Sequence, residues 1–237
     1  VGLLFVVVSG VVATVSLVQK PKEAKKSFAA AGGAVRGTAG DLWADIVLGK
    51  RDFGENSPGK VVPNKLLNAG GVVVDRSVSP NRMYVWDSGN NRILGISLGT
   101  CVEPGNCPVA LVIGQPSGTD YGACNQDSSF STYATLKLAS SSTLCGTNEW
   151  THDVDNEGSS VGMVVDASGN LYVPDFRNNR VLKFISPFTT DAIADEVWGQ
   201  PNFTSNGCNG VTPSALGSSI PFPTASTLCA GSGGFTI

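Results

Sequence analysis

Six cysteines are the residues of this chain whose type and spacing most directly indicate chemistry. The interval between Cys124 and Cys145 equals the interval between Cys208 and Cys229. Each pair ends in the phrase Ser-Thr-Leu-Cys, and its first cysteine precedes an asparagine. Because one pair recurs in two copies of one loop, the sequence predicts the disulfides Cys124–Cys145 and Cys208–Cys229.

The two remaining cysteines, Cys101 and Cys107, enclose a short segment with Pro and Gly. They are predicted to form a small disulfide at the tip of a hairpin, if the geometry permits. A zinc site is not expected, because the chain has no Cys-x-x-Cys motif and its single histidine is His152. Disulfides place the domain outside the cytoplasm.

A short acidic run is the second candidate site. Asp153, Asp155 and Glu157 stand at alternating positions and Gly158 follows, which resembles the first half of a calcium-binding loop. The bidentate glutamate that ends such a loop is absent, since Val164 occupies that position. A solvated acidic loop is therefore the alternative to a Ca²⁺ site, and no other cofactor is expected.

Little in the sequence supports catalysis or nucleic-acid binding. A serine nucleophile needs a base, and the one histidine belongs to no recognisable catalytic motif. The net charge of −3 and the lack of a basic, aromatic surface argue against a nucleic-acid partner. We therefore expect a protein that is not an enzyme.

An internal repeat indicates the elements that position these groups. Residues 71–96 and 162–184 share an apolar run ending in Asp, a turn, an aromatic-containing run ending in Asp, the tripeptide Asn-Asn-Arg and a further apolar run. A second phrase, at 44–53, 110–125 and 195–209, alternates with the first. Each unit therefore predicts four short antiparallel strands.

The segments YVWDSGNNRIL (84–94) and YVPDFRNNRVL (172–182) resemble NHL repeats. The resemblance covers residues 41–237 and implies an all-β propeller with four-stranded blades, and the second phrase resembles a subgroup of bacterial surface NHL proteins. Propellers have roughly four to eight blades, so about two repeats cannot close one. The chain also lacks an initial Met, and we expect a fragment of a larger propeller.

The polar residues of the motif recur in both units. They are Asp87, Asn91 and Arg92 in the first unit, and Asp175, Asn179 and Arg180 in the second. An arginine that binds a carboxylate or carbonyl across the turn would fix the turn's conformation. Because both units carry these residues, we interpret them as a structural blade motif rather than one site.

The N-terminal segment is apolar and uncharged over residues 1–18, which predicts one long helix. It is interpreted as a membrane anchor, as a type IV pilin-like helix that lacks that family's usual start, or as a cleaved signal peptide. The predicted domains are a hydrophobic helix at 1–19, a basic then Gly/Ala-rich linker at 20–40, and the propeller blades at 41–237.

These features predict a non-enzymatic protein of the cell surface, tethered by its N-terminal helix. The propeller would be a platform that binds or displays a protein or glycan, with the disulfide-clamped loops 114–161 and 199–237 as contact surface. An exposed tryptophan would be a candidate for stacking on a sugar or partner. One alternative is a homo-oligomeric filament subunit with residues 1–18 in the filament core. Another is a propeller lyase with metal-binding residues in missing blades.

Overall fold

The computed structural model describes the chain in segments. They are residues 3–8, 11–16, 44, 46–50, 52–55, 65–67, 69–101, 107–115, 124–125, 139–146, 162–210 and 222–229. The chain divides into two compact units, Val1–Gly32 and Gly33–Ile237.

The described part of the smaller unit is an antiparallel pair of strands, β1 (Leu3–Val8) and β2 (Val11–Ser16). The predicted N-terminal helix is therefore wrong. The segment is rich in Val, whose branched side chain favours a strand, and an apolar run does not by itself distinguish strand from helix. No helix among the described residues is long and apolar enough to cross a membrane.

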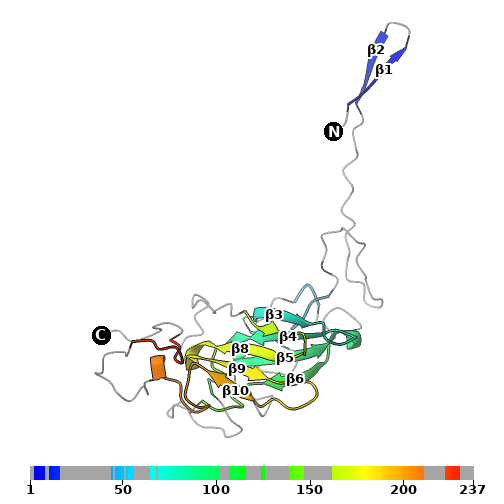
Figure 1. Ribbon diagram of the computed structural model, residues 1–237. Coiled ribbons are helices and arrows are strands. Elements are labelled where there is room, and N and C mark those ends of the chain that lie inside the picture. The colour runs from blue at the N-terminus through cyan, green and yellow to red at the C-terminus, as the bar shows by residue number, and fades with distance from the viewer. Residues whose placement is uncertain are drawn as a thin grey trace. The chain divides into compact units, whose positions relative to one another are not determined.

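The larger unit contains two four-stranded antiparallel sheets, in which strands adjacent in sequence are hydrogen-bonded neighbours. The first sheet consists of β3 (Ala69–Asp75), β4 (Arg82–Asp87), β5 (Arg92–Ser97) and β6 (Val109–Ile113). The second consists of β7 (Val164–Val165), β8 (Leu171–Asp175), β9 (Arg180–Phe184) and β10 (Glu196–Trp198). Figure 1 shows the second sheet in front of the first. Each repeat in the sequence thus forms one sheet.

Short 3-10 helices join several of these elements. They are η1 (Ser88–Asn90), η2 (Leu98–Thr100), η3 (Phe176–Asn178) and η4 (Cys208–Gly210). The turns that contain η1 and η3 end in Asn91 and Asn179, whose φ angles of 50° and 51° lie in the left-handed region. Asparagine tolerates this conformation better than most residues, which explains why it stands at this position in both repeats.

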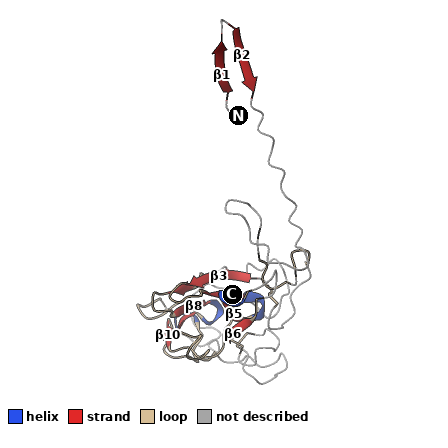
Figure 2. Ribbon diagram, turned by 90° about the vertical axis from the view of Figure 1, so that its right-hand side faces the viewer, coloured by secondary structure: helices blue, strands red, loops and turns tan. Residues whose placement is uncertain are grey.

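Each sheet has two faces, because successive side chains along a strand point in opposite directions. We call the face that carries Tyr84 in the first sheet, or Tyr172 in the second, the tyrosine face, and the other the opposite face. The tyrosine face of the first sheet packs against the opposite face of the second, and Figure 2 shows β8 and β10 on one side of β5 and β6. The buried side chains are Tyr84, Trp86, Ile93 and Ile113 from the first sheet, and Leu171, Val173, Leu182 and Phe184 from the second. Burial of each large apolar side chain contributes about 1.5–3 kcal/mol to this core.

The opposite face of the first sheet has a smaller core. Met83, Val85 and Ile96 pack there with Leu48 and Leu66, which come from the segment that precedes the sheet. The first sheet therefore packs against the second sheet on one face and is partly covered by this preceding segment on the other.

The predicted propeller is also wrong. The described residues form two stacked open sheets, and nothing in that arrangement closes a ring. The repeated sequence specifies the strands and the packing of one sheet on the next, but ring closure depends on the number of units and the angle between them.

Candidate functional site

The geometry that the two repeats share centres on a buried ion pair, which we call the Asp–Arg clamp. In the second sheet, the Arg180 Nε lies 2.8 Å from the Asp175 Oδ2, and both side chains are buried. The Asn178 side chain donates to the same carboxylate oxygen at 2.8 Å. In the first sheet, Asp87 and Arg92 form the same pair at 2.8 Å.

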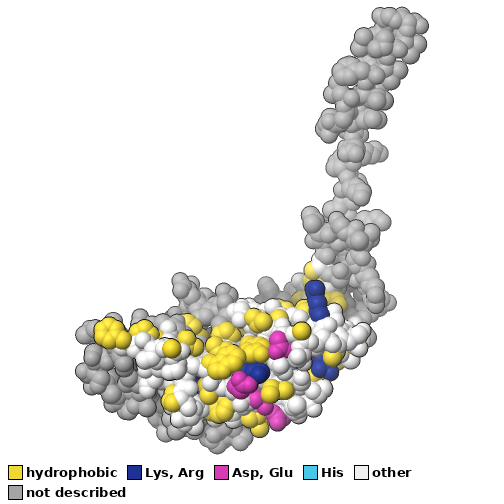
Figure 3. Space-filling model, viewed as in Figure 1, with side chains coloured by type: hydrophobic (Ala, Val, Ile, Leu, Met, Phe, Trp, Pro, Cys, Tyr) yellow, Lys and Arg dark blue, Asp and Glu magenta, His cyan; other side chains and the backbone are white. Residues whose placement is uncertain are grey.

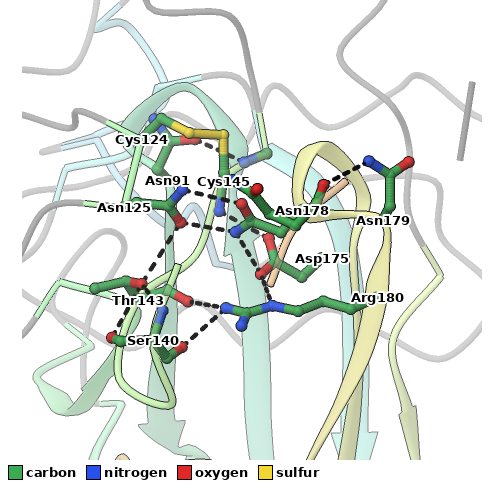
Figure 4. The surroundings of a disulfide bond; sticks show 12 residues. Asn91, Cys124, Asn125, Ser140, Thr143, Cys145, Asp175, Asn178, Asn179 and Arg180 are labelled. Carbon is green, nitrogen blue, oxygen red and sulfur yellow. Dashed lines mark hydrogen bonds and ion pairs between the residues drawn. A yellow bond between two sulfur atoms is a disulfide. The ribbon is translucent and has the colours of Figure 1, made fainter. Parts of the chain in front are cut away.

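Each clamp binds the backbone of the loop that precedes its sheet. The Asp175 carboxylate accepts a hydrogen bond from the Cys145 N–H at 2.8 Å, and the Arg180 guanidinium donates to the Ser140 and Thr143 carbonyls at 2.9 and 3.0 Å. Figure 4 shows these groups converging on the loop beside the Cys124–Cys145 disulfide. The clamp therefore connects the second sheet to the loop of the first repeat.

The first clamp uses the same atoms on a different segment. The Asp87 carboxylate accepts from the Leu67 N–H at 2.7 Å, and Arg92 donates to the Lys65 carbonyl at 2.9 Å. Burial raises the pKa of the Asp87 carboxyl, while hydrogen bonds from Asn90, Leu67 and Arg92 oppose that rise. Burial likewise raises the pKa of the Asp175 carboxyl against its attraction to Arg180.

The two asparagines of the motif hold neighbouring loops. The Asn91 side chain accepts a hydrogen bond from the Gly146 N–H at 2.7 Å, and the Asn179 side chain donates to the Asn206 carbonyl at 2.9 Å. All six predicted motif residues thus make structural contacts, and their arrangement has the chemistry of a scaffold.

The six cysteines form the three predicted pairs, Cys101–Cys107, Cys124–Cys145 and Cys208–Cys229. Three disulfides indicate an oxidising environment, as in extracellular or secreted proteins.

The candidate calcium ligands Asp153, Asp155 and Glu157 lie outside the described residues, as does His152. Within the described segments, no group of three or more His, Cys, Asp or Glu side chains is placed to hold a metal ion.

The disulfide-clamped loops were expected to form the contact surface. In the first of them, Thr143, Leu144 and Cys145 are buried, and the second clamp binds the Thr143 carbonyl and the Cys145 N–H. In the second, residues 222–229 are mostly exposed. Long parts of both loops lie outside the described residues.

Sequence reasoning missed several residues that stabilise the clamps. The buried amides of Asn125 and Asn178 exchange hydrogen bonds at 2.9 and 2.7 Å between the loop and the second sheet. Gln115 donates to the Asn90 and Asn91 carbonyls at 3.3 and 3.4 Å. The signal was present in the recurring phrases Gly-Gln-Pro and Cys-Asn, which a comparison of the two repeats could have assigned to this role.

The tyrosine face of the second sheet is the largest departure from the symmetry of the repeats. Trp198 is 45% exposed, whereas Ile113, at the equivalent position of the first sheet, is 1% exposed. Val164 is also exposed, whereas Val73, its counterpart in the first sheet, is partly buried and packs against the core between the two sheets. The same kind of surface is therefore buried once and open once.

Two aromatic rings stack on this open face. The Tyr172 and Trp198 rings stack with their centroids 5.6 Å apart and an angle of 22° between their planes. Figure 3 shows hydrophobic side chains gathered on this side of the molecule, next to a basic and an acidic group. Of the tryptophans that the structure describes, Trp86 lies in the core and Trp198 has the exposed position that suits stacking on a partner.

The charges beside the rings are paired with each other. Lys183 Nζ lies 2.7 Å from Glu196 Oε1, and that hydrogen bond raises the pKa of the lysine. A backbone hydrogen bond from Asn170 lowers the pKa of the Asp166 carboxyl, to which the Tyr172 hydroxyl also donates at 3.0 Å. A molecule that covers this face therefore meets charges that are already paired within the chain, and this pairing reduces the cost of their desolvation.

The sequence matches none of the protein-family models and none of the curated proteins with which it was compared.

Proposed function

We propose that this chain is a non-enzymatic extracellular binding domain that holds a protein partner on the tyrosine face of its second sheet. The observation that carries the proposal is the contrast between the two repeats. The second sheet packs on the equivalent face of the first sheet and buries Ile113 there, whereas Val164 and Trp198 in the second sheet are exposed. Exposed apolar surface flanked by polar groups is typical of interaction sites.

The clamps support a scaffold role for the rest of the molecule. Both arginine–carboxylate pairs are fully buried and are engaged with backbone groups of the chain itself. They hold the sheets rigidly, and a rigid surface loses little conformational entropy on binding. The residues of the clamp motif are also the basis of our proposal that the repeats are related to NHL repeats.

The test compares two exposed apolar residues of the second repeat. Trp198→Ser removes the exposed indole ring of the face, whereas Ile193→Ser is a matched control in the segment between β9 and β10. We expect labelled chain carrying Trp198→Ser to bind cells of its source at least about tenfold more weakly than wild type, since buried Trp residues dominate interface energies.

Equal binding by the Trp198→Ser and wild-type chains would contradict the proposal. The Ile193→Ser chain is expected to bind like wild type. Competition by soluble surface polysaccharide, with no competition by protein extract, would assign the face to a glycan instead.

A further inference from the structure

The loop at residues 222–229 reproduces the loop that the second clamp binds. The Thr224 N–H donates to the Thr227 hydroxyl at 2.9 Å, as the Ser140 N–H donates to the Thr143 hydroxyl at 2.9 Å. The Asn209 N–H donates to the Leu228 carbonyl at 3.0 Å, matching the 3.0 Å bond from Asn125 to Leu144. The loop therefore presents the Thr224 and Thr227 carbonyls and the Cys229 N–H in the pattern that an Asp–Arg clamp binds.

This loop is not clamped by the part of the chain that the structure describes. Leu228 is 42% exposed, whereas its counterpart Leu144 is fully buried. Together with Trp198 and Val164, Leu228 forms one end of the stack of sheets, which we call the tail surface. Two of the three equivalent segments, 65–67 and 139–146, are bound by a clamp, and residues 222–229 form the third.

The other end of the stack is incompletely covered. Leu48 and Leu66 pack on the opposite face of the first sheet, but a small cavity remains between them and Leu94 and Ile96. On the same face Val72 is 59% exposed, whereas its counterpart in the second sheet, Met163, is 6% exposed and lies in the core. We call this face, with Val72 and the Asp87–Arg92 pair, the head surface.

The two ends have complementary chemistry. The head surface carries an Asp–Arg clamp that has the same geometry as the one that already binds a loop of the tail type. The segment 65–67 that occupies this clamp supplies one carbonyl and one N–H, and the loop at 222–229 offers the same groups. The tyrosine face of a second sheet would also cover more of the apolar head surface than the short segment 65–67 does.

We propose that the tail surface of one chain binds the head surface of a second copy, whose Asp87–Arg92 clamp takes the Thr227 carbonyl and the Cys229 N–H in place of Lys65 and Leu67. This inference rests on the proposed function, because it names the partner of the exposed tyrosine face. The interface joins two different surfaces, so it is heterologous and permits a chain of copies to grow.

Sedimentation velocity of the purified full chain over a wide concentration range tests the proposal. Wild type is expected to form dimers and longer species as concentration rises. Trp198→Ser in the tail and Val72→Asp in the head are each expected to weaken association about tenfold or more, while Ile193→Ser leaves it unchanged. All three positions are exposed, so circular dichroism can check that the variants keep the native fold.

A mixture of the two variants distinguishes this arrangement from a symmetric one. Chains with Trp198→Ser retain a head, and chains with Val72→Asp retain a tail, so the mixture is expected to form a dimer that grows no further. Loosening the preceding segment with Leu66→Ala is expected to strengthen association, because it frees the head.

Two results would overturn the proposal. One is a monomer at every concentration, including with Leu66→Ala. The other is association that Val72→Asp does not weaken, which indicates tail-to-tail contact. A monomeric chain whose binding to cells still depends on Trp198 would overturn this inference and leave the proposed function standing.

Discussion

Replacing Arg180 with methionine is expected to lower the free energy of unfolding by about 3–5 kcal/mol, the usual cost of breaking a buried ion pair. The substitution leaves the fully buried Asp175 carboxylate without its cation, and it removes the donor to the Ser140 and Thr143 carbonyls. Urea unfolding followed by far-ultraviolet circular dichroism measures the loss. The first loop and the second sheet should separate early, because the clamp joins them.

Lys183→Met is the matched control. Lys183 also forms an ion pair in the second sheet, at 2.7 Å from Glu196, but that pair is partly exposed. Its removal is expected to change stability by less than about 1 kcal/mol. A loss for Arg180→Met as small as that of the control would show that the clamp does not hold the sheets together.

Removing the disulfide between Cys124 and Cys145 by a double serine substitution is expected to destabilise the domain by about 2–5 kcal/mol. The bond closes a loop with a sequence separation of 21 residues and holds in place Asn125 and the Cys145 N–H, which donates to the Asp175 carboxylate of the second clamp. Thermal unfolding with and without a reducing agent measures the effect.

The Cys208–Cys229 pair provides the control, because its sequence separation is also 21. The entropy of loop closure is then the same for both pairs, and any difference reports native contacts. Loss of Cys124–Cys145 is expected to cost more, since Leu144 is buried and Leu228 is exposed. Equal losses would contradict the role assigned to the first loop.

Much of the local structure could be predicted from the repeated phrases. The strands around Tyr84 and Tyr172, the disulfides Cys124–Cys145 and Cys208–Cys229, and the pairing of Asp87 with Arg92 follow from patterns that occur twice, and Cys101–Cys107 was the pair that remained. Repetition was informative because each copy checks the interpretation of the other. Short-range chemistry, such as a left-handed asparagine that ends a turn, depends on few residues and is therefore visible in the sequence.

The predictions that were wrong concern properties that no local pattern specifies. The apolar N-terminal segment forms strands β1 and β2 instead of a helix, because its many valines favour a strand and its hydrophobicity does not separate the two. Ring closure depends on the angle between sheets and on how many units are present. The groups that the clamps bind, such as the Ser140 carbonyl, are backbone atoms of distant loops, and side-chain types do not reveal them.

The exposed tyrosine face also required the structure. Trp198 and Ile113 stand at equivalent positions of the repeats, so from the sequence both are expected to be core residues. The structure shows that Ile113 is buried against the second sheet, whereas Trp198, on the outer face of the second sheet, is exposed.

Site-specific photo-crosslinking tests the central claim, that a protein partner covers the tyrosine face of the second sheet. A benzophenone amino acid at position 198, and in a matched chain at position 193, would be activated in native surface material and the products identified by mass spectrometry. The account predicts a defined protein crosslink from position 198 and little from position 193. Equal or no crosslinking from the two positions would contradict it.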